Sequence, residues 1–150
     1  MRLPESFIRL MNPIIYLVLA TPLRFFFVRT LLALRVLGRA TGRSITTPLR
    51  FEKSGDAVRC FTSVDTFWWR NVKASKEVQL LIRGQWYRAS AQVTSDDPDV
   101  LRPALEHMLR IYPQDAAYQN IRMIAGKPHP DDLQAAARRA VLVDFTLLSA

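Results

Sequence analysis

Hydrophobic residues follow a strand-like pattern over most of the chain after residue 30. A short apolar run at 31–37 is typical of a buried strand, and apolar residues then alternate with polar ones over 45–52. The predicted strands cover 31–37, 45–52, 57–62, 77–83, 85–93 and 141–147. Turn residues such as Gly84 separate them, which favours an α+β, mainly β fold: a small antiparallel barrel of about six strands with flanking helices.

Three intervening segments have helical spacing instead. They cover residues 67–73, 98–109 and 131–138. Asp96 and Asp97 open the second of these, and Asp131 or Asp132 can cap the third. A weaker helical pattern follows Tyr118. The strands and helices alternate without an internal repeat or a polar linker, so residues 30–150 are predicted to form one domain.

The first 29 residues are unusually apolar and are interrupted by arginines. Their charge-free run, 10–23, contains Pro13 and Pro22 and is shorter than the ~20 apolar residues that a spanning helix needs. The segment is therefore predicted to form short helical pieces that act as an interfacial membrane anchor, with the arginines near anionic lipid. Packing of the same segment on the barrel or on a partner fits the pattern equally well.

The charge and the cysteine content narrow the function classes. A formal charge of +8 attracts polyanions or an anionic membrane, but the arginines are scattered and no nucleic-acid-binding motif is present, so no nucleic-acid partner is predicted. The single cysteine, Cys60, fits a protein in a reducing, cytoplasmic compartment, either free or peripheral on the inner face of the cell membrane. Cys60 itself is predicted to be a small core residue. The chain has only two histidines: His107 lies off the apolar stripe of its helix and is predicted at the surface, and His129 has no partners nearby in sequence, so no metal site is predicted.

The turn at residues 38–44 has the composition of an anion site. It contains two glycines, two arginines and two hydroxyl residues between two predicted strands. Such a turn can aim backbone N–H groups and guanidinium groups at a phosphate, although glycine and threonine also serve ordinary turns. The chain has no nucleophile elbow, paired metal ligands or P-loop, so difficult chemistry would belong to a cofactor.

Four motifs resemble, in order and spacing, the deazaflavin-dependent nitroreductase family. They are Gly38-Arg39-Ala40-Thr41-Gly42-Arg43, Thr47-Pro48-Leu49, Phe67-Trp68-Trp69-Arg70-Asn71-Val72-Lys73-Ala74 and Ile111-Tyr112-Pro113. The similarity extends from about Leu31 to the C-terminus. It implies a split β-barrel, coenzyme F420 (an 8-hydroxy-5-deazaflavin) as the cofactor with FMN or haem as alternatives, and hydride transfer to a quinone, enone or nitroaromatic acceptor.

The resemblance also implies site residues, none of them catalytic. The implied cofactor-binding residues are Arg39, Thr41, Gly42, Arg43, Pro48, Asn71 and Lys73. The implied acceptor pocket contains Trp68, Trp69, Tyr112, Asp115 and Tyr118. Of the two adjacent tryptophans, one is expected in the core and the other beside a groove. Ala40 stands where relatives often have a basic residue, and Asp115, expected to face solvent, stands where the nitroreductase branch has a tyrosine, which argues against nitro reduction.

A second class of function remains open. A non-catalytic, membrane-associated split-barrel protein could bind a lipid, haem or flavin ligand after losing the chemistry. In the enzyme reading, the partners are a small-molecule acceptor, an anionic membrane surface through residues 1–29 and a second copy of the chain.

Overall fold

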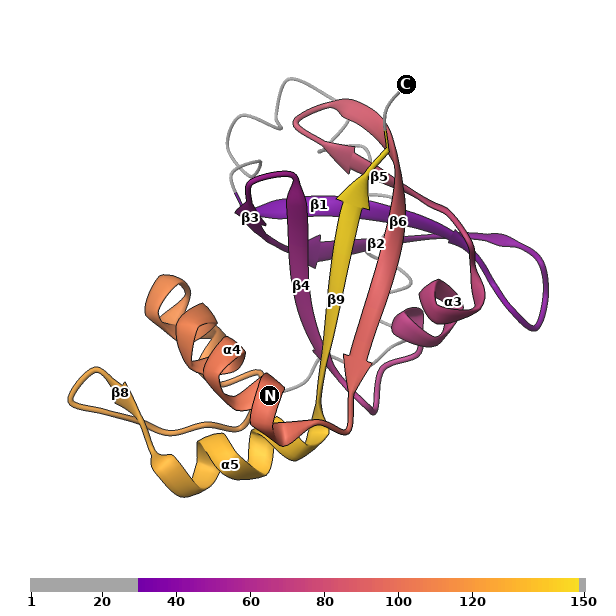
Figure 1. Ribbon diagram of the computed structural model, residues 1–150. Helices are drawn as coiled ribbons and strands as arrows, with labels where there is room; N and C mark the ends of the chain where they lie inside the picture. The colour runs from indigo at the N-terminus through magenta and orange to yellow at the C-terminus, as the bar shows by residue number, and fades with distance from the viewer. Residues whose placement is uncertain (1–29, 149–150) are drawn as a thin grey trace. The chain divides into compact units, whose positions relative to one another are not determined.

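The computed structural model describes residues 30–148 of the 150-residue chain (Figure 1). The predicted anchor at 1–29 lies outside the described residues, so its role and the proposed domain boundary at residue 30 stay predictions. Within the described part, no helix is both long enough and apolar enough to cross a membrane.

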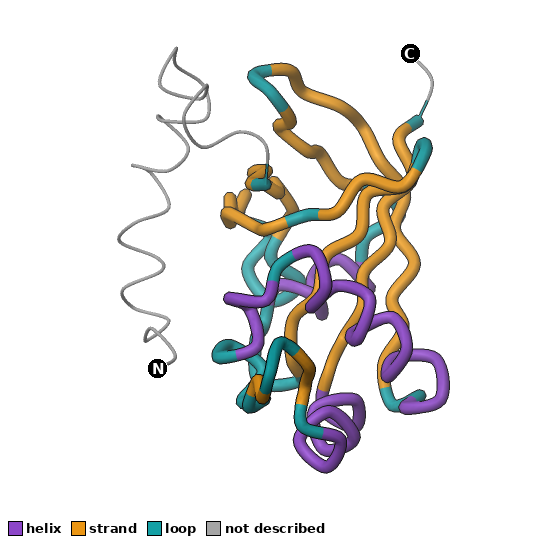
Figure 2. The backbone as a smooth tube through the Cα atoms, turned by 90° about the vertical axis from the view of Figure 1, so that its left-hand side faces the viewer, coloured by secondary structure: helices purple, strands orange, loops and turns teal. Residues whose placement is uncertain are grey.

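The chain divides into two compact units. A sheet unit comprises residues 30–60, Phe67–Val93 and 143–148, and a helical unit comprises Phe61–Thr66 and Thr94–Leu142. Strands, drawn orange in Figure 2, account for most of the sheet unit, whereas the two longer helices belong to the helical unit.

Within residues 30–148, seven strands form one sheet, in the order β2-β1-β5-β6-β9-β4-β3. Their bounds are β1 Leu31–Leu37, β2 Ser44–Arg50, β3 Glu52–Ser54, β4 Ala57–Ser63, β5 Val78–Ile82, β6 Gln85–Ser95 and β9 Ala140–Leu147. A separate two-stranded sheet contains β7 Met123–Ile124 and β8 Lys127–Pro128. The architecture confirms the mainly antiparallel, split-barrel α+β prediction. The additional strand is β3, which pairs with β4 across a turn where Gly55 has φ +60°.

β1 lies between β2 and β5 in the sheet. All seven of its residues pair with β2, and Ala33 to Arg35 also pair with β5. Leu32, Leu34 and Val36 are buried on one face, while Ala33 packs with Leu81 on the other. A strand buried on both faces reads as a nearly continuous apolar run, which is why the sequence pattern predicts this strand correctly.

β9 departs from the alternation expected for the closing strand. Residues 140–143 are all buried, and alternation begins only after them. Leu142, which alternation alone would place on the solvent face, packs with Leu101 and Ala137 of the helical unit. Helical side chains therefore cover the face that a simple strand pattern predicts to be exposed.

The described part of the chain also contains three α-helices and one 3₁₀ helix. They are α3 Trp68–Ala74, α4 Pro98–Ile111, η1 Pro113–Ala116 and α5 Pro130–Arg139. Asp97 caps α4 by accepting a bond from the N–H of Val100 at 3.4 Å, as expected. The helix expected after Tyr118 is absent from the described residues. Asn120 has φ +57° and the N–H of Ile121 bonds back to the carbonyl of Ala116, a combination that ends a helical turn.

The first turn of α5 differs from its predicted cap. His129 is the N-cap residue and makes no side-chain cap bond, because Pro130 at the first helical position starts the helix before the two aspartates. Asp132 instead accepts bonds from the backbone N–H of Arg122 at 3.0 Å and from its Nε at 2.8 Å. His129, expected to lack partners, has Nδ1 3.8 Å from Asp132.

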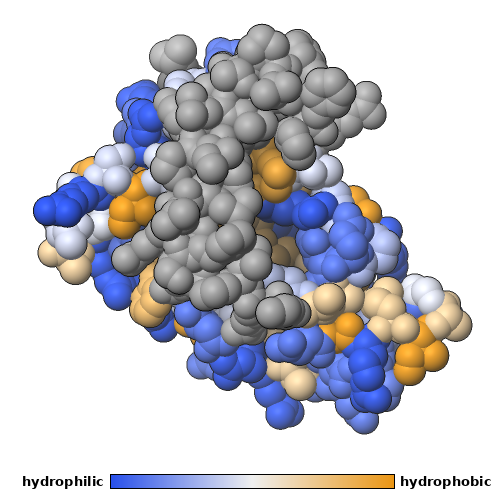
Figure 3. Space-filling model, turned by 180° about the vertical axis from the view of Figure 1, so that it is seen from behind, coloured by the Kyte–Doolittle hydropathy of each residue, from blue (hydrophilic) through white to orange (hydrophobic). Residues whose placement is uncertain are grey.

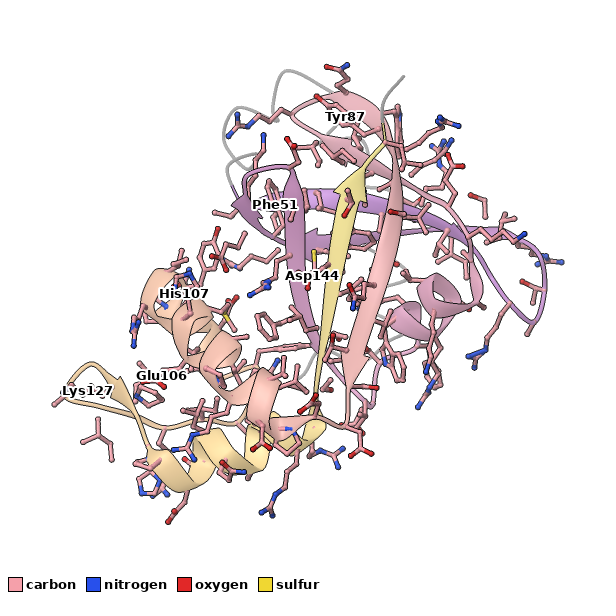
Figure 4. The ribbon with its side chains drawn as sticks, viewed as in Figure 1. Phe51, Tyr87, Glu106, His107, Lys127 and Asp144 are labelled. Carbon is pink, nitrogen blue, oxygen red and sulfur yellow. The ribbon has the colours of Figure 1, made fainter. Side chains whose placement is uncertain are left out.

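Two further expectations concern single side chains. Cys60 is buried in the core, as predicted, and its burial together with nearby Asp144 raises the pKa of its thiol. His107 is exposed on α4, also as predicted, and is labelled in Figure 4. Among residues 30–148, no group of three potential metal ligands comes together.

The Asp132–Arg122 pair should make the stability of the helical unit depend on acid pH. The bonds from Arg122 lower the pKa of Asp132 from 3.8 to about 2. A lowered folded-state pKa stabilises the protein above the unfolded pKa of about 4, and the stabilisation is lost as pH falls toward 2. We expect Asp132→Asn to lower the melting temperature at pH 7 and the difference from wild type to shrink between pH 4 and pH 2.

Thermal unfolding monitored by circular dichroism across that range measures the difference. Asp131→Asn is the matched control, because Asp131 lies in the same helical turn without an ion pair to Arg122. A wild-type to Asp132→Asn difference that is constant from pH 7 to pH 2 would contradict the prediction.

Candidate functional site

The turn at residues 38–44 is called the coenzyme turn because the resemblance implies its residues as cofactor-binding. It is held mainly by its own backbone. The N–H of Gly38 donates to the carbonyl of Arg43 at 2.8 Å, and the N–H of Gly42 donates to the carbonyl of Gly38 at 2.7 Å. The N–H of Arg43 donates to Oγ1 of Thr41 at 3.3 Å. These three N–H groups are therefore engaged within the turn, and the side chains of Arg39 and Arg43 are the exposed groups that remain for an anion.

Two glycines are required by this conformation. Gly42 has φ +69°, where other residues are strained. A Cβ on Gly38 would lie 2.9 Å from Oγ1 of Thr41 and 3.1 Å from Cδ1 of Ile45, closer than side chains normally pack. The absence of a side chain at Gly38 thus leaves space for Thr41 and Ile45. The side chains of Arg39 and Arg43 remain exposed.

A single hydrogen bond joins the coenzyme turn to α3. The backbone N–H of Arg39 donates to Oδ1 of Asn71 at 3.1 Å. Asn71 and Lys73 lie on the same short helix, with Lys73 exposed in its last turn. Two segments more than thirty residues apart in sequence, both implied as cofactor-binding, are therefore adjacent within the sheet unit. Pro48 lies apart from them, on β2 opposite Ala33 of β1.

Both tryptophans of α3 are buried. Trp68 is 9% exposed and Trp69 is 8% exposed, so neither borders an open groove in the way expected of one of them. The guanidinium carbon of Arg70 lies 4.9 Å from the centre of a Trp69 ring. Nε1 of Trp69 is buried and has no hydrogen-bond partner among residues 30–148, which leaves one indole N–H free to meet a bound group.

The remaining acceptor-pocket residues belong to the helical unit. Tyr112 ends α4 and packs against the apolar cluster that contains Leu105 and Met108. Asp115 lies in η1 and is half-buried, whereas it was expected to face solvent. Tyr118 is 41% exposed. Their part in binding an acceptor stays a prediction.

A hydroxyl cluster that sequence reasoning missed surrounds Tyr118. It comprises Thr62, Ser63, Thr66 and Tyr118: Oγ1 of Thr62 lies 2.7 Å from Oγ1 of Thr66 and 3.4 Å from the Tyr118 hydroxyl. Oγ of Ser63 is buried and has no partner within the described part of the chain. The signal available in the sequence was a run of hydroxyl residues between the strand predicted at 57–62 and the helix predicted at 67–73.

The donor set of the sheet unit fits an anionic coenzyme. Arg39, Arg43 and Lys73 are exposed cations, and none of them forms an ion pair with a described residue. Guanidinium groups bind phosphate and carboxylate in pairs of parallel bonds, and an ammonium group binds them as a point charge. The unpartnered indole N–H of Trp69 adds a neutral donor on the same helix as Lys73.

Comparison with known structures supports the fold. The chain is similar to a putative pyridoxamine 5′-phosphate oxidase from Listeria innocua (TM-score 0.54, 10% identity, covering 93% of this chain and 94% of that one). It is also similar to HutZ, the haem storage protein from Vibrio cholerae (TM-score 0.55, 12% identity, 93% and 92%), and to a protein described as a domain-swapped dimer (TM-score 0.54, 17% identity, 95% and 99%). No curated protein matches the sequence significantly.

One family model matches most of the chain. It describes the F420H(2)-dependent quinone reductases and matches residues 23–125, which include the coenzyme turn, α3 and Tyr112. The chain therefore belongs to the F420H(2)-dependent quinone reductase family and is an F420-dependent oxidoreductase.

Proposed function

We propose that the protein transfers hydride from reduced F420 to a quinone or enone, with the coenzyme bound along the coenzyme turn and α3. The observation that carries the proposal is the bond from the Arg39 N–H to Asn71, which holds Arg39 next to the helix that bears Lys73. A deazaflavin coenzyme has a phosphate followed by several carboxylates. It needs a track of cations longer than one phosphate pocket, and these residues supply such a track.

The chain's own residues are proposed to bind and orient the coenzyme and the acceptor. Arg39 and Arg43 are proposed to bind the phosphate, and Lys73 the first carboxylates. The bound coenzyme supplies the hydride, so the protein has only to hold the reactants and stabilise the charge that develops on the acceptor. The exposed Tyr118 hydroxyl, which lies 3.4 Å from Oγ1 of Thr62, is proposed to turn its O–H from Thr62 to an acceptor oxygen. Thr66 donates to the carbonyl of Ser63 and accepts from Thr62, so it ends the chain of hydroxyls.

Asp115 favours quinones over nitroaromatics in this proposal. Its half-buried carboxylate stands where the nitroreductase branch has an aromatic ring. A carboxylate is costly to desolvate beside an apolar acceptor, and it removes the aromatic surface that the nitroreductase branch has at this position.

The partners follow from the same reasoning. The acceptor is a small molecule, a second copy of the chain is the proposed protein partner, and residues 1–29 are proposed to bind an anionic membrane. If the protein binds no F420, the alternative is a non-catalytic split-barrel protein that holds a lipid, haem or FMN.

Coenzyme binding should depend on the cations of the track. We expect Arg39→Ala and Lys73→Ala each to weaken F420 binding about threefold to tenfold, since exposed charge-assisted contacts contribute less than buried ones. Asn71→Ala should weaken it without changing the charge, because it releases the turn from α3. Fluorescence titration of the coenzyme measures all three.

Two variants serve as controls for that titration. Arg138→Ala removes an exposed cation from α5, and Gln92→Ala removes an exposed amide from β6; both should bind the coenzyme like wild type. Absence of binding by wild type, or equal effects of Arg39→Ala and Arg138→Ala, would favour the lipid, haem or FMN alternative.

Acceptor choice should depend on Asp115. Wild type is expected to turn over a quinone at least about tenfold faster than a nitroaromatic, the equivalent of about 1.4 kcal/mol in the transition state, and Asp115→Tyr should narrow that ratio. Asp131→Asn, which removes a carboxylate of α5, is the control for charge alone. Equal kcat/KM values for both acceptors in wild type would refute the prediction.

Membrane association should depend on the apolar N-terminal segment. Full-length protein is expected to sediment with anionic vesicles, less so as salt rises, because part of the attraction is between surface charges. Changing Phe25, Phe26 and Phe27 together to serine should reduce the bound fraction, whereas Arg138→Ala should not. Equal sedimentation of wild type and the triple variant would show that these residues are not the anchor.

A further inference from the structure

A hollow lies in the sheet unit. It is partly open to solvent, and its empty space is about 420 Å³ with the open mouth included. It is lined by Phe51, Lys53, Val58, Ile82, Arg83, Tyr87 and Leu147. Figure 4 labels Phe51, beside β3 and β4, and Tyr87, near the hairpin of β5 and β6.

The hollow lies away from the coenzyme turn. The β1–β2 register places Leu37 and Ser44 next to that turn, and Leu31 and Arg50 at the other end of the same pair of strands. Phe51 directly follows Arg50, and its N–H donates to the carbonyl of Thr30 at 2.9 Å. The hollow is therefore at the end of β1 opposite to the coenzyme turn.

The lining separates into an apolar floor and a cationic edge. Phe51, Val58 and Ile82 are buried, and Tyr87 and Leu147 are half-buried. Lys53 and Arg83 are exposed, no carboxylate lines the hollow, and neither cation forms an ion pair with any residue of the described part of the chain. Such a lining suits a molecule with an apolar body and an anionic head, since each part meets its complement.

Arg83 has a backbone conformation that asparagine or glycine adopts more readily than arginine. Ile82 pairs with Gln85, so Arg83 and Gly84 form a two-residue hairpin loop in which φ is +51° and +77°. Positive φ at both positions is typical of a type I′ turn, for which asparagine followed by glycine is strongly preferred. Arginine is strained there, and such strain is concentrated at functional positions.

We propose that this hollow binds an anionic amphiphile with a single alkyl chain, whose head meets Lys53 and Arg83 and whose chain lies against Phe51, Tyr87 and Leu147. The ligand is either a free fatty acid or alkyl phosphate, or the corresponding part of a membrane lipid. The second source is relevant because the apolar segment 1–29 joins the sheet unit at Thr30, next to Phe51. Figure 3 shows a view from behind, in which hydrophilic residues cover much of the coloured surface between separate apolar patches.

Calorimetric titration of the full chain with monomeric probes tests the proposal. Dodecanoate and dodecyl phosphate should bind, and dodecyltrimethylammonium, with the same chain and the opposite charge, should bind at least about tenfold more weakly. Arg83→Asn and Lys53→Gln should each weaken dodecanoate binding about threefold to tenfold.

These variants are chosen so that folding does not obscure the result. Asparagine tolerates positive φ better than arginine, so Arg83→Asn should fold at least as well as wild type, which a melting curve checks. Lys127→Gln, at an exposed cation of β8 that does not line the hollow, is the matched control and should leave binding unchanged. Equal binding of the anionic and cationic probes, no binding of either, or indifference to Arg83→Asn and Lys53→Gln together would overturn the proposal.

A sedimentation assay distinguishes the two sources. The fraction of protein that sediments with vesicles of phosphatidylcholine and phosphatidylglycerol is compared between wild type and the double variant Lys53→Gln/Arg83→Asn. If the ligand is a membrane lipid, less of the double variant should sediment. If the ligand is a free amphiphile, the two proteins should sediment equally, and only the calorimetric titration should detect the difference in binding. The site is independent of the proposed coenzyme track: Arg39→Ala should not change dodecanoate binding, and Arg83→Asn should not change F420 binding.

Discussion

Hydrogen bonding of β1 on both of its edges determines where the candidate coenzyme site lies. With β2 on one side and β5 on the other, the strand cannot shift without breaking two ladders, so the turn that follows Leu37 has a fixed starting point. The bond from the Arg39 N–H to Asn71 then connects this turn to α3. The backbone that carries Arg39 is thus held near a helix, which would lower the entropic cost of binding the proposed anionic coenzyme.

The helical unit contributes a different kind of chemistry. Its hydroxyl cluster is partly buried, with Tyr118 at the exposed end and Thr62 in the core. Thr66 donates to the carbonyl of Ser63 at 3.0 Å, so Thr62 donates to Thr66, and the Tyr118 hydroxyl is the donor in its contact with Thr62. The exposed cations of the proposed coenzyme track belong to the sheet unit and the hydroxyl cluster belongs to the helical unit.

How much of this could be predicted from the sequence differs from one element to another. The hairpins and α4 are predicted correctly because each has one face toward solvent and one toward the core, so apolar residues recur at regular intervals in the sequence. β9 was only partly predicted, since helical residues cover Leu142 and remove that period. The cap of α5 was predicted incorrectly because the helix begins at Pro130, ahead of the two aspartates, and because Asp132 pairs with Arg122 instead of capping the helix. The contact between Arg39 and Asn71, and that between Thr62 and Tyr118, join residues too far apart in sequence for spacing to show.

The burial of Cys60 has a consequence for a protein of this family. Quinones and enones are electrophiles that add covalently to thiolates, and an exposed cysteine with an ordinary pKa would be slowly alkylated by them. The chain contains one cysteine, which is enclosed in the sheet unit, and its raised pKa keeps the sulfur protonated. An electrophilic acceptor therefore meets no reactive sulfur on this chain, so repeated turnover need not inactivate the protein through its own thiol.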